Sequence, residues 1–374
     1  MVVVVVLLSM VLLTYVVWQW RLRMLFLRLW GDVGSDRNTE SMATLLVPFR
    51  NEIVNLPTLV DSLPSDWPAI FINDHSEDGG PHYLQTRLAD RPADRLLHLA
   101  DYLGERPVTA YKKAALTYGI ASADSEVIIT TDADCRWPPG APAELLATFG
   151  EDTVAVCGPV EIVGERHGLL YGLQALDLWA YQFLTAAWTV SGRPGLANGA
   201  CFAFRRGAFA EVNGYGGMDH LPSGDDVLLL HKMAEHYPPE AFRWSRQAEP
   251  VATRAVTTWR AFWRQRLRWA GKAGHYRNRR LDVAQALTFA ANGSLLVLAG
   301  LLFFLPLRPR LVVLAVMAAK LAVDYLNLRL ILGRYGRTRL LRHYPAVALV
   351  YPFYLVAIGG AALLGVKTEW KGRT

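Results

Sequence analysis

The sequence predicts an α/β protein in which a mostly parallel sheet domain is flanked by transmembrane helices. Between residues 41 and 275, short β-branched runs alternate with helix-like stretches, the pattern of a parallel sheet covered by helices. Apolar segments long enough to cross a bilayer precede and follow this region. The composition agrees, because 52% of the residues are hydrophobic and only 19% are charged. We therefore expect an N-terminal transmembrane anchor at residues 1–20, an α/β domain at residues 41–275 and a C-terminal membrane region with three helices at residues 284–366.

The first segment carries no charge from residue 1 to residue 20 and then runs into Arg21, Arg23 and Arg28. It lacks the basic start and the small-residue cleavage site of a signal peptide. Basic residues favour the cytoplasmic side of a span. The pattern therefore predicts an anchor with its N-terminus outside and the α/β domain in the cytoplasm, at what we expect to be a bacterial inner membrane.

Of the three C-terminal segments, residues 284–307 and 345–366 are free of charge, whereas residues 311–332 contain Lys320 and Asp324. These two residues are four apart, so on a helix they can pair, which lowers the cost of burying them. The arginine-rich connection that follows is expected in the cytoplasm. Four spans would place both termini outside, and one interfacial segment would return the C-terminus to the inside.

The net charge of +6 and the pI near 9.2 could indicate a nucleic-acid partner. Much of the positive charge, however, flanks the apolar segments, where attraction to an anionic membrane surface accounts for it. We therefore expect the lipid bilayer, and no nucleic acid, as a partner. The three cysteines lack the spacing of a metal site and fit a reduced compartment.

Three strands are expected in the first half of the α/β domain. Thr44–Val47 is closed by Pro48, Ala69–Ile72 follows, and Glu126–Thr131 is the third strand. A helix over Ala110–Ala121 leads into the third strand.

Polar clusters follow each of these strands, at residues 48–52, at residues 73–79 and at Asp132 with Asp134. The second cluster alone could be an Asx-turn that caps a helix. Since the carboxyl ends of parallel strands meet at one edge of a sheet, three such clusters favour a shared site. Carboxylates together with substrate phosphates are the usual ligands of Mg²⁺, so the two aspartates suggest a metal–diphosphate site.

These residues resemble the motifs of a known family. The matching segments, in chain order, are Val47–Glu52, Asp74-His75-Ser76-Glu77-Asp78-Gly79, Lys113-Ala114-Ala115-Leu116, Asp132-Ala133-Asp134, Asp225-Asp226 and Gln265-Arg266-Leu267-Arg268-Trp269. In this order they are similar to a membrane-bound family-2 inverting glycosyltransferase with a GT-A nucleotide-sugar fold, over roughly residues 43–270. Asn73 stands where many members have aspartate, and Asp225 where glutamate is usual.

The resemblance implies a role for each residue. Asp134, assisted by Asp132, would hold Mg²⁺ or Mn²⁺ on the diphosphate, and Asp226 would be the general base for the acceptor hydroxyl. The nucleotide-binding set would be Glu52, Asp74, Asp78, Lys113 and Asp132. The set that binds the acceptor or the diphosphate would be Asp225, Gln265, Arg268 and Trp269.

Two segments have competing interpretations. Gln265, Arg268 and Trp269 share one face of a helix, which suits a sugar and a diphosphate, but the basic and aromatic residues around them also suit a helix lying on a membrane surface. Both roles can hold, on different faces. Asn198–Arg206 resembles the stretch that lines the acceptor side, and it also fits a buried strand followed by a turn.

The expected function is therefore metal-dependent inverting transfer, of the hexosyltransferase type, from a nucleotide sugar, with UDP as the expected nucleotide. The expected acceptor is a membrane lipid or lipid-linked glycan at the cytoplasmic face. The alternatives are a processive polysaccharide synthase, for which three C-terminal segments are few, a membrane-bound nucleotidyltransferase, and an inactive scaffold that kept the fold. The C-terminal Trp370–Arg373 resembles a tail that some family members carry on the cytoplasmic side.

Overall fold

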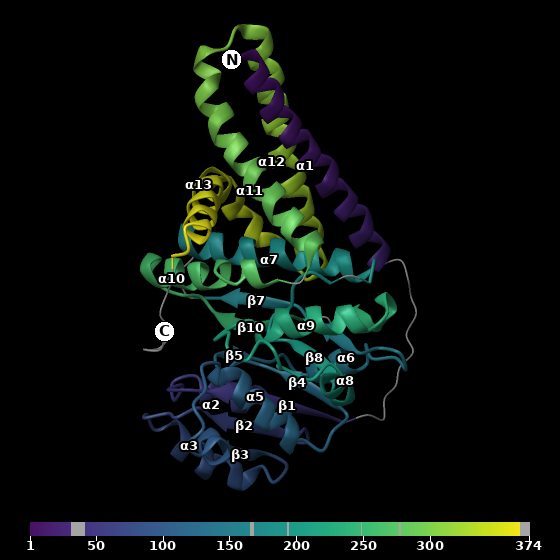
Figure 1. Cartoon of the computed structure of the whole chain (residues 1–374), viewed down its shortest axis with the longest axis vertical. Helices are drawn as coiled ribbons and strands as arrows, with labels where there is room; N and C mark the ends of the chain where they lie inside the picture. The colour runs from purple at the N-terminus through teal and green to yellow at the C-terminus, as the bar shows by residue number, and fades with distance from the viewer. Residues whose placement is uncertain (31–41, 165–167, 193, 248, 277, 367–374) are drawn as a thin grey trace. The chain divides into compact units, whose positions relative to one another are not determined.

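The computed structural model describes residues 1–30, 42–164, 168–192, 194–247, 249–276 and 278–366; the Trp370–Arg373 tail lies outside this set (Figure 1). The chain forms two compact units. The sheet unit comprises residues 32–163 and 188–254, and the helical unit comprises residues 1–31, 164–187 and 255–374. Residues 164–187 and 255–275, expected in the α/β domain, thus group with the apolar helices.

The sheet unit is built on a seven-stranded sheet, ordered β3-β2-β1-β4-β8-β6-β9. Its strands are β1 (Ala43–Phe49), β2 (Ala69–Asn73), β3 (Arg95–His98), β4 (Val127–Thr130), β6 (Ala155–Cys157), β8 (Phe202–Arg205) and β9 (Phe242–Trp244). Neighbours from β3 to β4 are parallel, as are β6 and β9, whereas β8 runs antiparallel to β4 and β6. The mostly parallel α/β sheet expected from the sequence is confirmed.

The strand predicted to close at Pro48 continues to Phe49, with Pro48 in register with Ile72. Proline is tolerated because alternate residues of β1 bond to opposite neighbours. Leu45 donates its N–H to the β2 side, while the carbonyl of Leu46 accepts from the segment that follows β4. Residue 48 faces the same side as residue 46, beyond the β1–β4 pairing, so its missing N–H leaves no ladder partner unpaired.

A second sheet in this unit has the order β5-β10-β7. Its strands are β5 (Cys135–Arg136), β7 (Val160–Val163) and β10 (Val251–Arg254). The helices of the unit are α2 (Leu56–Ser62), α3 (Gly80–Arg87), η1 (Leu88–Asp90), α4 (Leu99–Leu103), α5 (Tyr111–Ser122), α6 (Ala141–Leu146), α8 (Arg206–Glu211), α9 (Asp225–His236) and η2 (Pro239–Ala241). Because β5 follows Asp134 directly, its pairing with β10 holds the end of the Asp-x-Asp segment in place.

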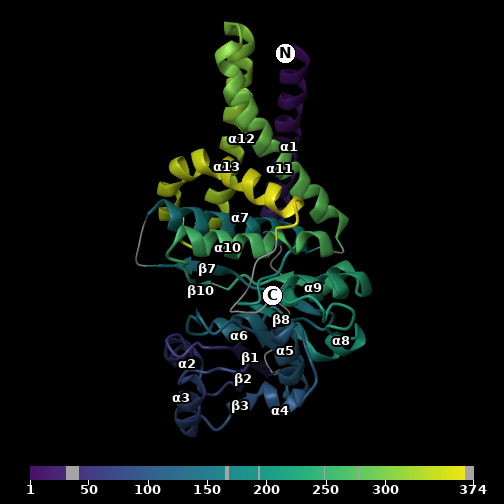
Figure 2. The ribbon, with the colours of Figure 1, turned by 60° about the vertical axis from the view of Figure 1, so that its left-hand side comes forward.

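The helical unit contains all four segments expected to span a membrane. Its helices are α1 (Val2–Leu29), α7 (Leu169–Thr189), α10 (Trp259–Ala270), η3 (Ala273–His275), α11 (Arg279–Leu301), η4 (Leu302–Phe304), α12 (Leu307–Arg334), η5 (Thr338–His343) and α13 (Tyr344–Leu363). Helices over residues 2–29, 279–304, 307–334 and 338–363 are long and apolar enough to cross a bilayer. Within this unit, α7 and α10 lie across one end of the longer helices (Figures 1 and 2).

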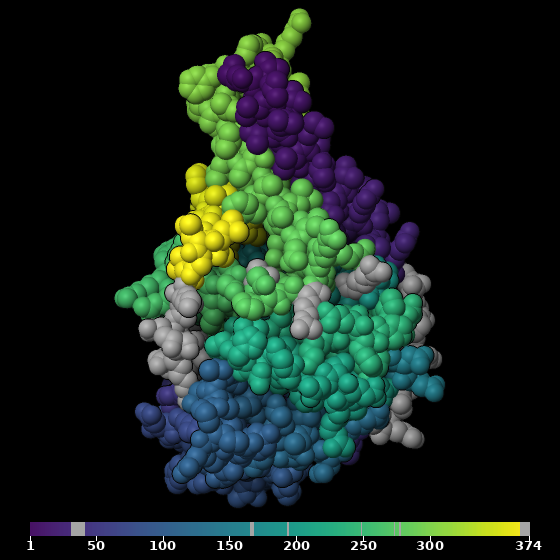
Figure 3. All heavy atoms as spheres, viewed as in Figure 1, coloured from purple at the N-terminus to yellow at the C-terminus, as the bar shows by residue number. Residues whose placement is uncertain are grey.

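Polar side chains join the long helices to one another. Lys320 and Asp324 pair at 3.0 Å, as their spacing predicts, and Tyr15 of α1 donates to Asp324 at 2.9 Å. Lys320 also donates to Asn292 of α11 at 3.0 Å. These contacts lie beside an apolar cluster that includes Leu12 and other residues of α1, α11 and α12. In the space-filling view the atoms of α1 pack directly against those of its neighbours in this unit (Figure 3).

Candidate functional site

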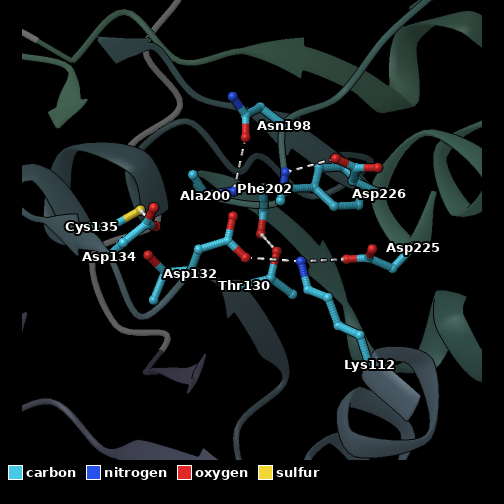
Figure 4. A network of polar contacts seen from close by, with 12 residues as sticks. Lys112, Thr130, Asp132, Asp134, Cys135, Asn198, Ala200, Phe202, Asp225 and Asp226 are labelled. Atoms are coloured by element: carbon cyan, nitrogen blue, oxygen red, sulfur yellow. Dashed lines mark hydrogen bonds and ion pairs between the residues drawn. The ribbon is translucent and has the colours of Figure 1, made fainter. Parts of the chain in front are cut away.

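The centre of the site in the sheet unit is a lysine held between two carboxylates (Figure 4). Lys112 of α5 places its Nζ 2.8 Å from Asp132, which follows β4, and 3.1 Å from Asp225, which begins α9. Burial lowers the pKa of the Lys112 ammonium, but the carboxylates of Asp132, Asp225 and Asp226 outweigh this and raise it well above its ordinary value. The structure therefore brings the Asp-x-Asp segment and the Asp225-Asp226 segment into one charged cluster.

Asp134 lies in a crowded anionic environment. Burial, followed by the nearby charges of Asp132 and Glu52, raises its pKa from 3.8 to about 6. Its Oδ2 accepts a hydrogen bond from Thr253 of β10 at 3.3 Å. Repulsion between like charges raises the pKa of a carboxyl group, and a cation bound between the charges removes that repulsion.

These carboxylates fit a divalent metal. Among the residues that the structure describes, no cluster of three or more histidine, cysteine, aspartate or glutamate residues is arranged to enclose an ion. Mg²⁺ and similar hard cations are, however, commonly held by one or two carboxylates, with water and substrate phosphates completing the set. Asp132 and Asp134 match that donor set.

Asp226 is fixed by two backbone donors. Its Oδ2 accepts from the N–H of Gly199 at 2.9 Å, and its Oδ1 accepts from the N–H of Val227 at 2.7 Å. Gly224, at the N-cap of α9, has φ of +82°, a conformation that glycine adopts without strain. The turn at Gly224 thus places two aspartates in the first turn of α9, where the helix dipole favours negative charge.

Gly199 borders the same cluster, although it was not singled out within the Asn198–Arg206 segment. A Cβ atom on Gly199 would lie 3.4 Å from Lys112 Nζ, 3.5 Å from Asp225 and 3.7 Å from Asp226. It belongs to the Asn198–Arg206 segment, in which β8 begins at Phe202. The segment is therefore a buried strand, and its leading turn approaches the carboxylates.

The two loops expected to bind the nucleotide are joined by hydrogen bonds. Asn51 donates its N–H to Ser76 at 3.0 Å, and its side-chain oxygen accepts from the N–H of Glu77 at 2.8 Å. Asp78 accepts from the N–H of Ile53 at 2.9 Å and from that of Gly80 at 3.0 Å. The Asp78 carboxylate therefore ties the backbone of the first loop to that of the second.

Two other members of the expected nucleotide set lie in these loops. Asp74 is buried and contacts the imidazole of His75 at 3.0 Å. Glu52 accepts a hydrogen bond from Asn55 at 2.6 Å and contributes to the raised pKa of Asp134.

Lys113 was expected to bind the nucleotide, but it is its neighbour Lys112 whose ammonium contacts the carboxylates. Lys113 is buried, and its ammonium donates to the carbonyls of Met218, Leu221 and Ser223 at 2.7–3.1 Å. It therefore supports the segment that leads into α9. The family pattern that Lys113–Leu116 was expected to match is Lys-x-x-Ala-Leu, and in this chain that spacing begins at Lys112, which is the signal that identifies it.

Gln265, Arg268 and Trp269 lie on α10, in the helical unit. All three are half-buried, whereas Arg266 between them is buried. The helix begins at Thr258, whose hydroxyl accepts from the N–H of Ala261 at 3.2 Å. The structure thus brings together the acidic residues, Lys112 and the nucleotide loops in the sheet unit, and it carries the Gln-x-x-Arg-Trp motif on a helix of the other unit.

Comparison with known proteins gives the class. Residues 44–212 match the family model described as Glycosyl transferase family 2, so the chain contains a family-2 glycosyltransferase domain and is a glycosyltransferase. No curated protein matches the sequence.

Among solved structures, the mannosyltransferase PcManGT from Pyrobaculum calidifontis in complex with GDP-Man and Mn²⁺ is 20% identical, with a TM-score of 0.54, over 92% of this chain and 98% of that one. The glucosyl-3-phosphoglycerate synthase of Mycobacterium tuberculosis matches at a TM-score of 0.42 and 20% identity, over 62% and 78% of the two chains. The mannosyl-3-phosphoglycerate synthase of Rubrobacter xylanophilus matches at 0.42 and 14%, over 61% and 71%. The PcManGT match confirms the GT-A fold.

Proposed function

We propose that this protein transfers a sugar, with inversion, from a nucleoside-diphosphate sugar to a lipid or lipid-linked acceptor at the cytoplasmic face of a bacterial inner membrane. The observation that carries the proposal is the Lys112 contact with both Asp132 and Asp225. It joins the carboxylates assigned to the leaving diphosphate and the motif assigned to the acceptor base within one cluster. A transferase that forms and breaks a glycosidic bond needs both functions side by side.

On the donor side, Asp134 and Asp132 would hold Mg²⁺ or Mn²⁺, which neutralises the charge of the departing diphosphate. The relative bound to GDP-Man and Mn²⁺ supports a divalent cation and a nucleotide sugar. Asp74 and Asp78 would serve the base-binding loop, with Glu52 nearby, and we assign to Lys112 the phosphate-side role first expected of Lys113.

On the acceptor side, Asp226 would take the proton of the attacking hydroxyl. The Gly199 and Val227 N–H groups hold its carboxylate in one orientation. Asp225 would keep Lys112 in place, while Gln265, Arg268 and Trp269 would bind the acceptor sugar or the diphosphate.

The four apolar helices support a membrane location, and a membrane enzyme has ready access to amphiphilic acceptors. The arginines in the C-terminal part of α1 and those that follow α12 favour the cytoplasmic side for these ends of the helices. A nucleotidyltransferase would share the carboxylates and the metal, but it would not need a base at Asp226.

The test is to incubate membranes that contain the protein with a panel of labelled UDP- and GDP-sugars and Mn²⁺ or Mg²⁺, then extract the lipids. We expect label from one donor class in the lipid fraction, and none with Asp226→Asn membranes. Release of labelled sugar 1-phosphate and NTP when pyrophosphate is added, without labelled lipid, would favour the nucleotidyltransferase. Long polymer in the insoluble fraction would favour the processive synthase.

A further inference from the structure

The second residue of the Gln-x-x-Arg-Trp motif, Arg266, is a charged residue that is buried. It is 2% exposed, although the helix that carries it is rich in exposed basic residues such as Arg264. The family motif leaves this position open. A buried guanidinium is costly unless it is paired, so its surroundings must account for its presence.

Arg266 pairs with a carboxylate on a different helix of the same unit. Its Nη1 lies 2.8 Å from Asp177 Oδ2, and the Asp177 side chain on α7 is fully buried. Tyr351 of α13 donates to the other oxygen of Asp177 at 3.0 Å, and Tyr354 is 3.5 Å from Oδ2. One carboxylate therefore joins α7, α10 and α13.

The guanidinium also stacks on the aromatic rings of its own helix. Its Cζ lies 4.4 Å from the ring centroid of Trp269 and 5.0 Å from that of Phe262. Phe262 in turn packs against Tyr354, with ring centroids 5.3 Å apart. The guanidinium is planar and lies in an ion pair with Asp177, so it presents a flat cationic face to the Trp269 indole.

The start of α10 is tied to α7 as well. The Gln174 side chain accepts from the N–H of Val256 at 3.0 Å and donates to the carbonyl of Val256 at 3.1 Å. The axial position of α10 is therefore held at two points by one helix. Such fixing is what a binding residue on α10 would require, because a displacement of about 1 Å can cost two orders of magnitude in rate.

Stability alone explains this arrangement poorly. Replacing a buried ion pair by apolar residues of similar volume is often neutral or stabilising. The pair lies against the Trp269 ring of the motif, and this contact points to a specific geometric role.

We propose that Asp177 and Arg266 are positioning residues that fix the Trp269 indole of the Gln-x-x-Arg-Trp motif. The proposal deepens the proposed function and rests on it only where Trp269 is taken to contact the acceptor. The ion pair sets the direction of the guanidinium, and the guanidinium sets the orientation of the indole.

The experiment uses the full-length protein in lipid nanodiscs. Arg266→Lys keeps the charge but removes the planar surface, and the double variant Asp177→Leu with Arg266→Met replaces the pair with apolar side chains. Arg264→Lys, on the exposed side of the same helix, is the matched control. For each we measure the melting temperature, the donor affinity, and kcat and KM for the acceptor.

We expect both altered proteins to melt close to the wild type and to bind the donor within about twofold of it. Their transfer kcat should fall by about tenfold or more, and the control should not change. Full activity in the apolar double variant would show that the pair is only structural. Full activity in a folded Arg266→Lys protein would show that the planar surface is not needed.

A second readout does not depend on transfer. In protein labelled with 5-fluorotryptophan, the ¹⁹F resonance that disappears in Trp269→Phe reports on the indole. We expect it to be sharp in the wild type and shifted or broadened in Arg266→Lys. An unchanged resonance would overturn the proposal even if the wild type transferred no sugar, whereas a failed transfer assay with a changed resonance would count only against the proposed function.

Discussion

Replacing Asp226 with asparagine should stop catalysis and leave the fold in place. A positioned general base typically contributes about 10²–10⁴-fold, which corresponds to about 2.7–5.4 kcal/mol of barrier. The structural cost is smaller. Asparagine can still accept from one of the two N–H groups, of Gly199 and Val227, that now bond to the carboxylate. We therefore expect the loss of about one hydrogen bond, near 1 kcal/mol, and of a helix-dipole interaction of about 0.3–1 kcal/mol.

The assay is lipid-linked transfer under single-turnover conditions, with donor binding and thermal melting measured in parallel. We expect a rate loss of at least about 100-fold, with donor affinity within about threefold of the wild type. Asp219→Asn, in the exposed loop before α9, is the control and should remain active. A variant at Asp226 that transfers at a rate near the wild type would remove this residue from the mechanism, and loss of donor binding would reassign it to the nucleotide.

Three further predictions concern the same cluster. Lys112→Met should leave Asp132 and Asp225 without their shared cation. The transfer rate should then fall by at least about tenfold and depend more strongly on the divalent metal, whereas unchanged kinetics would contradict the phosphate-side role. Because the pKa of Asp134 is about 6, protons should compete with the metal below that pH, and Mn²⁺ affinity measured by calorimetry should fall by up to about tenfold per pH unit from pH 6 to 5 while it levels off above pH 7. A flat profile would refute this. Gly224→Ala should lower the free energy of unfolding by about 1 kcal/mol or more, because φ is +82° there, whereas Gly207→Ala inside α8 should be neutral or stabilising; equal effects would contradict the strain argument.

The sheet could be predicted because its central strands are buried along their whole length. Every residue of β2 and β4 is buried, so their sequences are continuous apolar runs, and polar residues mark where they end. The antiparallel insertion of β8 between β4 and β6 could not be predicted in the same way, since its pairing depends on residues far apart in the chain.

The choice between Lys112 and Lys113 shows a second limit. Neighbouring residues on a helix point about 100° apart, so which lysine faces the carboxylates depends on how α5 is rotated. That rotation is set by tertiary packing of its buried face, which includes Ala115, Leu116 and Ile120. Local sequence reveals that a helix carries two lysines, and only the packing assigns one to the site and the other to the segment before α9.

The Asp177–Arg266 pair could not be predicted at all from local pattern. In sequence, α10 has the composition of a membrane-surface helix, and α7 has the composition of an apolar core helix. The partner of each charge lies in the other helix, and only the folded unit brings them within 2.8 Å.

The contact between Tyr15 and Asp324 has a consequence for biogenesis. Tyr15 belongs to α1, and its partner belongs to α12, which is synthesised after residues 42–254. Until then α1 has no access to the apolar cluster that it later shares with α11 and α12. The helical unit therefore closes only after the sheet unit has been synthesised, and α1 must be stable without its later partners in the meantime. Residues 1–20 carry no charged side chain, and such a helix can be stable in an apolar environment before α11 and α12 are present.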